Sequence, residues 1–129
     1  MDRALLRELA KKASELAHSP YSKAKIGSAV FTADGKYYSG CNVENSSYGA
    51  TVCAERDAIF KAISEGSKQI TAIYVYSKDG WPPCGMCRQV MTEFSDVDLV
   101  IIYGNEKGLE NETTLGKLFP CAFTPEHLK

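Results

Sequence analysis

The chain has 129 residues, about the length of one domain, and its 44% hydrophobic content can form a buried core without a disulfide framework. Fifteen Lys and Arg residues against sixteen Asp and Glu give a net charge of -1, so the composition offers no support for binding to nucleic acid or anionic lipid. Five cysteines are an odd number and too sparse for a small secreted disulfide fold, which favours thiols kept for metal binding or chemistry.

The N-terminal segment is predicted to form an amphipathic helix. Apolar residues follow helical spacing from Leu5 to Ala17, Asp2 can cap the start, and Ser19-Pro20 prevents continuation. Charged residues interrupt the apolar positions, so the segment does not resemble a signal peptide, and no apolar run approaches the roughly 18 residues that a membrane span needs. We therefore expect a soluble, cytoplasmic protein.

A β-hairpin is expected next. Residues 26–32 are rich in β-branched and small side chains, Ala33-Asp34-Gly35-Lys36 has the composition of a turn, and residues 37–41 resume an extended pattern. The polar residues 42–50 then form a loop. A second helix is predicted over residues 53–65, followed by Gly66 as its stop signal.

The rest of the chain alternates strands and helices. We predict a strand over residues 70–77, a helix starting near Pro83, a strand over residues 98–103 and a short helix over residues 115–119. This alternation indicates right-handed crossovers between parallel strands, beside the antiparallel hairpin. The predicted fold class is α/β: a three-layer α/β/α sandwich with a mixed β-sheet, in a single domain of residues 1–129.

Two short motifs carry candidate chemistry. In Pro83-Cys84-Gly85-Met86-Cys87, two thiols lie three residues apart at the start of a helix, a spacing that fits either a redox centre or half of a zinc site. Cys53 starts the other predicted helix, and Glu55 follows two residues later. Since two helix N-termini with sulfur ligands can converge on one ion, we favour a zinc site.

A zinc site with three thiolates remains negatively charged before its fourth ligand binds. Helix dipoles offset part of that charge. Arg56, beside the first ligand, is well placed to hydrogen-bond a ligand sulfur, and Arg88 is a second candidate. Reducing the charge on sulfur matters because an electron-rich zinc ion is a poorer Lewis acid.

The number of protein ligands separates two kinds of zinc site, because catalytic zinc has three and a water molecule whereas structural zinc has four. Cys41 and Cys121 are the candidates for a fourth ligand. Neither has ligand-pair spacing with another cysteine, so we interpret both as small hydrophobic residues. His18 and His127 are assigned no ligand role.

The chain also resembles a known family, the zinc-dependent cytidine deaminases, in the small form that acts on free nucleosides. The wider class has a His or Cys ligand, a Glu two residues later and a P-C-x-x-C pair. These features match Cys53-Ala54-Glu55 and Pro83 to Cys87. The similarity extends, in the family's order, through Tyr21-Ser22, residues 26–29, residues 40–45, Cys87-Arg88-Gln89 and residues 120–123.

The resemblance implies that Cys53, Cys84 and Cys87 bind one Zn²⁺ per chain and that Glu55 is the catalytic proton shuttle. Zinc lowers the pKa of bound water from 15.7 to about 7, which provides hydroxide for attack on C4 of cytosine. Glu55 would carry the proton to N3 and then to the leaving amine. The implied reaction is hydrolytic deamination of cytidine and deoxycytidine to uridine and deoxyuridine, with release of ammonia, in pyrimidine salvage.

The resemblance also implies substrate-binding residues. Asn42 and Glu44 would bind the ribose hydroxyl; the alternative is that they are ordinary turn residues. Tyr48 would line the same pocket or belong to the core. Phe123 resembles the aromatic residue that a neighbouring subunit inserts over the base in tetrameric members, which implies a homotetramer with shared sites. The alternative role of Phe123 is to cap the core.

Ala24 departs from the family, because many members have a phenylalanine there that packs on the pyrimidine. A wider base pocket is therefore predicted.

Several other functions are consistent with parts of this pattern. A related amino-pyrimidine nucleoside, such as a nucleoside antibiotic, is the second candidate substrate because of Ala24. Editing of DNA or RNA is less favoured, because the sequence has no basic stripe with interleaved aromatic residues. A structural-zinc interaction module would need a fourth protein ligand, and a redox protein would need a metal-free CxxC pair.

Overall fold

The computed structural model describes residues 1–129 and contains helices on both sides of one β-sheet. The elements in chain order are α1 (Arg3–Ser14), β1 (Gly27–Thr32), β2 (Tyr37–Cys41), η1 (Tyr48–Ala50), α2 (Ala54–Ser64), β3 (Ile70–Tyr76), α3 (Gly85–Phe94), β4 (Val100–Gly104), β5 (Glu110–Thr114), α4 (Leu115–Leu118) and η2 (Pro125–Leu128).

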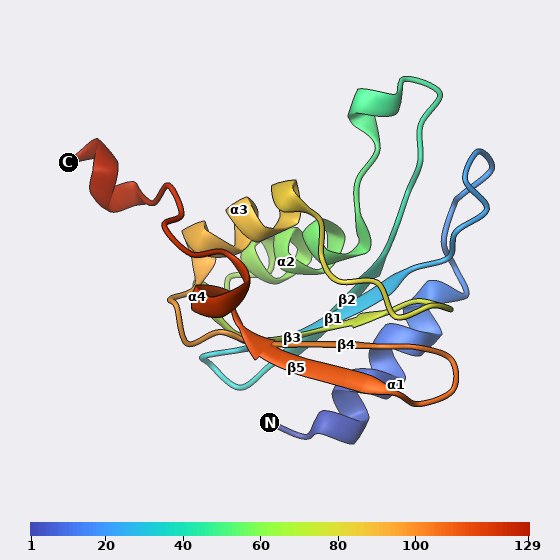
Figure 1. Ribbon diagram of the computed structural model, residues 1–129, viewed down its shortest axis with the longest axis horizontal. Coiled ribbons are helices and arrows are strands. Elements are labelled where there is room, and N and C mark those ends of the chain that lie inside the picture. Colours follow the sequence, from blue (N-terminus) through green and yellow to red (C-terminus); the bar gives the residue numbers. More distant parts are fainter.

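The sheet has five strands in the order β2-β1-β3-β4-β5. Strands β3 and β4 are parallel, and the other neighbouring pairs are antiparallel. Helix α1 covers one face, whereas α2 and α3 cover the other (Figure 1). The predicted three-layer α/β/α sandwich with a mixed sheet is confirmed.

The two faces of the sheet bury different sets of side chains, because successive residues of a strand point to opposite faces. In β1, Val30 faces α2 and α3, whereas Ala29 faces α1. The core beneath α2 and α3 includes Val30, Ala58, Ile59, Ile73, Cys87, Met91 and Ile101. The core beneath α1 includes Leu6, Ala10, Ala29, Ala72, Tyr74 and Ile102. Cys87 thus belongs to the packed core, which holds its sulfur in a fixed place.

Two elements differ from the sequence-based expectation. Strand β5, which was not predicted, has the polar sequence Glu-Asn-Glu-Thr-Thr and pairs with β4 at the edge of the sheet. An exposed edge strand does not require the alternating apolar residues that identify a half-buried strand. Helix α1 ends at Ser14 rather than Ala17, and Leu16 is 80% exposed.

Gly27 allows α1 to pack directly on β1. A Cβ atom at this position would lie 1.8 Å from the Ala10 carbonyl oxygen and 2.6 Å from the Ser14 nitrogen. We expect Gly27→Ala to lower the free energy of unfolding by about 3 kcal/mol, because neither backbone group can move without displacing α1. Urea denaturation measures this change. Gly49→Ala is the control, since a Cβ there meets nothing within 4 Å; equal midpoints for the two variants would contradict the close packing.

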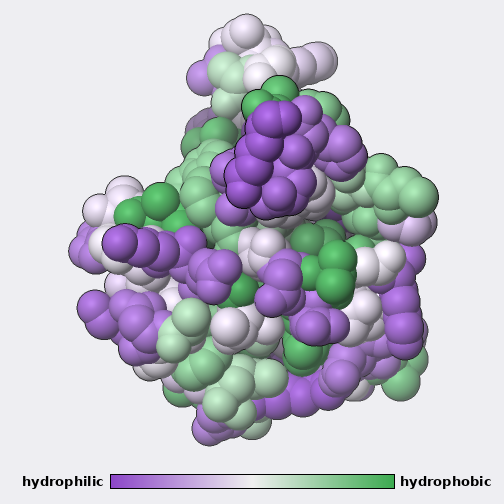
Figure 2. All heavy atoms as spheres, turned by 90° about the vertical axis from the view of Figure 1, so that its left-hand side faces the viewer, coloured by the Kyte–Doolittle hydropathy of each residue, from purple (hydrophilic) through white to green (hydrophobic).

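None of the helices combines the length and the apolar character that would let it cross a membrane. Figure 2 views the side that carries the C-terminal tail, where apolar residues form separate patches between hydrophilic ones. Phe123 and Leu128 are exposed in this tail.

Candidate metal centre

Two helix N-termini bring cysteine side chains together. Cys53 is the N-cap residue of α2 and Cys84 is the N-cap residue of α3. Both have an extended backbone, and neither thiol caps its own helix. Ser, Thr, Asp and Asn usually occupy this position because their oxygen accepts a backbone N–H. A cysteine leaves its sulfur available for another partner, and the third thiol, Cys87, is in the first turn of α3.

The three sulfur atoms have the spacing of a tetrahedral metal site. The Sγ atoms of Cys53, Cys84 and Cys87 all lie within 4.8 Å of one another. The distance from Cys84 is 3.6 Å to Cys53 and 3.4 Å to Cys87. Tetrahedral ligands at a Zn–S distance of about 2.3 Å are about 3.8 Å apart. Because thiolates are soft ligands that Zn²⁺ prefers, both the donor set and its spacing fit zinc.

The thiols interact strongly with one another and with an arginine. The pKa of Cys53 is lowered to about 5, first by a hydrogen bond from the Cys87 thiol and also by Arg56. The pKa of Cys87 is raised, because it donates that hydrogen bond and is buried. Arg56 Nη2 donates to Cys53 Sγ over 3.6 Å and to the Thr51 carbonyl over 3.2 Å. The arginine therefore supplies the positive charge beside sulfur that the sequence predicted.

Glu55 is buried beside this cluster. Only 4% of the residue is exposed, although its carboxylate lines the cavity next to the cysteines. Burial, and in the same direction the negative charge of Cys53, raise the pKa of Glu55 to about 7. A carboxyl group that changes protonation near neutral pH suits proton transfer. Burying a carboxylate costs free energy, and Glu55 lies beside the thiols rather than in a structural ion pair, so this placement favours a chemical role.

A cavity of about 290 Å³ lies over the cluster. Its walls include two of the thiols, the carboxylate and two further residues that the sequence predicted for substrate binding. These are Cys53, Cys84, Glu55, Asn42 and Glu44. The structure thus brings these residues from three separate segments to one cavity.

Asn42 and Glu44 also hold the loop of residues 21–26. Asn42 Oδ1 accepts from the Ile26 nitrogen at 2.9 Å, and Nδ2 donates to the Ala24 carbonyl at 2.8 Å. Glu44 Oε1 accepts from the Tyr21 and Ser22 nitrogens, while Oε2 accepts from the Ser22 hydroxyl. The hydrogen bond from the Ser22 hydroxyl lowers the pKa of Glu44. These two residues are therefore more than ordinary turn residues, because they fix one wall of the cavity.

Tyr48 and Phe123 do not line this cavity within the single chain. Tyr48 lies on the loop between β2 and α2, is 74% exposed and packs edge-on against Tyr21. Phe123 is 54% exposed and stacks on His127 at a centroid distance of 5.2 Å. Neither side chain is part of the core, so the core alternatives for both residues are wrong.

The remaining candidates lie elsewhere. Cys41 and Cys121 are not in the sulfur cluster, which therefore contains three protein ligands rather than four. Cys41 is half-buried, but Cys121 is exposed, so the expectation that Cys121 is a buried hydrophobic residue is wrong. Arg88 donates to the Leu118 carbonyl at 2.9 Å and lies over the Phe119 ring, with no hydrogen bond to a ligand sulfur.

Sequence reasoning missed Trp81, which lines the cavity together with Ser22, Ala24 and Ile26. Trp81 is the only tryptophan of the chain, and it lies just before the Pro83 to Cys87 motif. An isolated tryptophan next to a ligand motif was a usable signal. The direction of the Trp81 side chain depends on the path of the preceding loop, which the sequence pattern does not specify.

Comparisons with known proteins agree with this arrangement. Residues 2–104 match the family profile described as "Cytidine and deoxycytidylate deaminase zinc-binding region". The chain is 46% identical to a cytidine deaminase of Halalkalibacterium halodurans over 99% of this chain and 98% of that one. It is 48% identical to a cytidine deaminase of Sporosarcina psychrophila over 92% of this chain and 88% of that one.

A solved structure has the same fold. The crystal structure of a cytidine deaminase from Burkholderia pseudomallei superposes with a TM-score of 0.91 at 44% identity. The match covers 95% of this chain and 100% of that one.

Proposed function

Because this chain belongs to the cytidine and deoxycytidylate deaminase family, we propose that it is a zinc-dependent hydrolase that deaminates cytidine and deoxycytidine. The products are uridine or deoxyuridine and ammonia, and one water molecule is consumed per turnover. The observation that carries the proposal is the meeting of three thiols and a buried carboxylate at one cavity. Residues 1–129 act as a single catalytic domain.

Cys53, Cys84 and Cys87 are the residues that hold the metal. Zinc bound by three protein ligands supplies a nucleophile at neutral pH, since it lowers the pKa of water from 15.7 to about 7. The N-termini of α2 and α3 stabilise the thiolates through the helix dipoles. Arg56 reduces the negative charge of Cys53 through its hydrogen bond.

Glu55 moves the protons of the reaction. Its carboxylate takes a proton from the attacking water and delivers it to N3 of the cytosine ring, which lets C4 accept the nucleophile without full negative charge on the ring. Glu55 then carries the proton of the hydroxyl added at C4 to the exocyclic amine, so that the C4–N bond breaks, ammonia leaves and the C4=O bond of the product forms. The buried position of Glu55 keeps bulk water from competing for these protons.

Asn42 and Glu44 bind the ribose. Both already contact the loop of residues 21–26, but each has hydrogen-bonding capacity left. Glu44 accepts three hydrogen bonds of about four that a carboxylate can take, and the Asn42 amide has a second N–H. A ligand without a ribose hydroxyl would leave this remaining hydrogen-bonding capacity unused, which favours nucleosides over free bases.

Incubation of the zinc-loaded protein with cytidine tests the proposal directly. We expect the absorbance of cytidine to change to that of uridine, with ammonia released in equal amount. Deoxycytidine is the second substrate. Failure of protein with one zinc per chain to convert either nucleoside would contradict the proposed function.

Structural-zinc and redox functions have less support. The sulfur cluster has three protein ligands, whereas a structural zinc site has four. The CxxC pair forms one cluster with Cys53, and Cys84 shares a cavity with Cys53 and a buried carboxylate, an environment that a simple dithiol centre does not require. A metal-free protein that reduces disulfides but leaves cytidine unchanged would favour the redox alternative.

We further propose a cytoplasmic homotetramer that functions in pyrimidine salvage, with each active site completed by a neighbouring subunit. The five free cysteines suit a compartment that keeps thiols reduced. Phe123 and Tyr48 are exposed aromatic residues outside their own cavity, so both are available to a second chain. Sedimentation of the native protein tests the tetramer, and a monomer at assay concentration would contradict it.

Mixing two impaired variants tests the shared site. We expect Phe123→Ala to lose about 10-fold or more in kcat/KM, because an aromatic contact with the base contributes about 1–3 kcal/mol. Co-refolding this variant with Glu55→Gln produces some sites that combine an intact Glu55 with an intact Phe123 of another chain. Activity should therefore rise above that of either variant alone. Activity equal to the average of the two parents would show that Phe123 does not act across subunits.

A further inference from the structure

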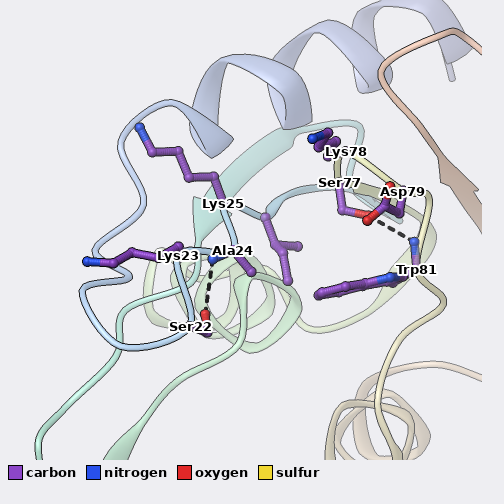
Figure 3. A pocket seen from close by; sticks show the side chains of 9 residues that line it. Ser22, Lys23, Ala24, Lys25, Ser77, Lys78, Asp79 and Trp81 are labelled. Carbon is purple, nitrogen blue, oxygen red and sulfur yellow. Dashed lines mark hydrogen bonds between the residues drawn. The ribbon is translucent and has the colours of Figure 1, made fainter.

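A second cavity borders the catalytic one. A cavity of about 410 Å³ lies beside it, and the two share Ser22, Ala24, Ile26 and Trp81 as lining residues. Figure 3 shows the second cavity, between the loop of residues 22–25 and the segment that follows β3. Its volume exceeds that of the catalytic cavity, and no step of the proposed deamination uses it.

Ala24 is the small residue on the boundary between the two cavities. Its backbone is held on both sides, because its nitrogen donates to Ser22 Oγ at 3.0 Å and its carbonyl accepts from Asn42 at 2.8 Å. One of these two groups, Asn42, is also proposed to bind the ribose. Ala24 has the smallest side chain among the residues that line both cavities, so a large side chain here would separate the two.

Trp81 forms the opposite wall. Ser77 Oγ accepts from the nitrogens of Gly80 and Trp81, at 3.0 and 2.8 Å, and so closes a tight turn after β3. Gly80 has a φ of +75°, which favours glycine, and Ser77 is only 3% exposed. In Figure 3 the indole ring extends from this turn toward the segment that carries Ala24.

The second cavity is not built to bind an anion. Lys23, Lys25 and Lys78 contribute to its lining, together with Asp79. In Figure 3, however, the ammonium groups of Lys23 and Lys25 point away from the space between Ala24 and Trp81. No pair of cations converges there, so a phosphate or carboxylate would find no bidentate partner. The shared walls are instead mainly apolar.

We propose that this second cavity is an extension of the substrate site that accepts an apolar substituent on C5 of the cytosine ring, with the Trp81 indole packed against it. The inference rests on the proposed deaminase function. In that reaction C4 lies at the metal, N3 faces Glu55, and N1 carries the sugar. The C5–C6 edge is then the only ring edge without a polar atom, and Ala24, Ile26 and Trp81 offer the matching apolar wall.

The kinetic test compares cytidine, 5-methylcytidine and 5-propynylcytidine. The readout is the ratio of kcat/KM for 5-propynylcytidine to that for cytidine, in the native protein and in Ala24→Phe and Ala24→Leu. We expect this ratio to fall by about 10–100-fold in Ala24→Phe and less in Ala24→Leu, because each blocks the connection in proportion to its size. Lys25→Ala, which alters the rim of the second cavity only, should leave the ratio unchanged.

Binding provides a readout that does not depend on turnover. Trp81 is the only tryptophan, so tryptophan fluorescence reports on this wall alone. In a zinc-loaded Glu55→Gln background, 5-propynylcytidine should change the fluorescence and bind at least as tightly as cytidine. Ala24→Phe in that background should weaken 5-propynylcytidine by about 10-fold or more relative to cytidine.

The outcomes separate the extension from the function on which it rests. If the native protein converts neither cytidine nor its 5-substituted forms, the proposed function fails. If it converts cytidine but discriminates against 5-propynylcytidine as strongly as Ala24→Phe does, the function stands and the extension is wrong. Fluorescence that does not respond to 5-propynylcytidine would likewise overturn the contact with Trp81.

Discussion

Replacing Glu55 by glutamine is expected to lower kcat for cytidine by about 10²- to 10⁴-fold while the protein keeps one zinc per chain. Glutamine has nearly the same shape, so the cavity and the three thiols remain in place. It cannot accept a proton from water or deliver one to N3 and the amine. Binding should change little in comparison, because the substrate contacts proposed for Asn42 and Glu44 are retained.

Two measurements on the same sample decide this prediction. Zinc is quantified by atomic emission, and turnover by the absorbance assay at high enzyme concentration. Glu93→Gln is a matched control, since Glu93 is an exposed residue of α3 and its loss should leave both values unchanged. Loss of zinc from Glu55→Gln would assign Glu55 a structural role, and undiminished kcat would mean that another group moves the protons.

Replacing Cys84 by alanine is expected to remove zinc and abolish measurable turnover. The remaining thiols, Cys53 and Cys87, give only two ligands, which is too few for a stable site with an open position. The loss of activated water removes several kcal/mol of transition-state stabilisation, on the order of 10³-fold or more in kcat. The Cys84 side chain is exposed, so its loss leaves no core cavity and the fold should persist.

Cysteines outside the cluster supply the controls. Cys41→Ser and Cys121→Ser should each retain one zinc per chain and nearly full turnover, since neither sulfur is in the cluster. Circular dichroism checks that every variant is folded. If Cys41→Ser or Cys121→Ser releases zinc, or if Cys84→Ala keeps it, the three-ligand assignment is wrong.

The sequence predicted the metal cluster because its determinants are local. Cys53 and Cys84 each precede a helix, and the residues that start α2 and α3 could be recognised from composition alone. The parallel pairing of β3 with β4 also followed from local pattern, since a helix between two neighbouring strands requires a crossover. That topology places the N-termini of α2 and α3 at the same end of the sheet, where they converge.

Features that depend on tertiary contacts were harder to predict from the sequence. Strand β5 is polar throughout, and its pairing with β4 is visible only once the sheet is assembled. The sequence placed Asn42 and Glu44 at the site, but their hydrogen bonds to the loop of residues 21–26 join positions about 20 residues apart. Trp81 was not predicted as a site residue, because the turn at Ser77 directs its ring into the cavity and the surrounding sequence pattern does not reveal this turn.

Three cysteines are proposed to hold a catalytic zinc ion with one position open to water. X-ray absorption at the zinc edge of the metal-loaded protein tests this arrangement directly, because it counts the neighbours of the metal. We expect three sulfur atoms at about 2.3 Å and one oxygen at about 2.0 Å. Four sulfur neighbours would show a closed, structural site and contradict the proposed deaminase mechanism.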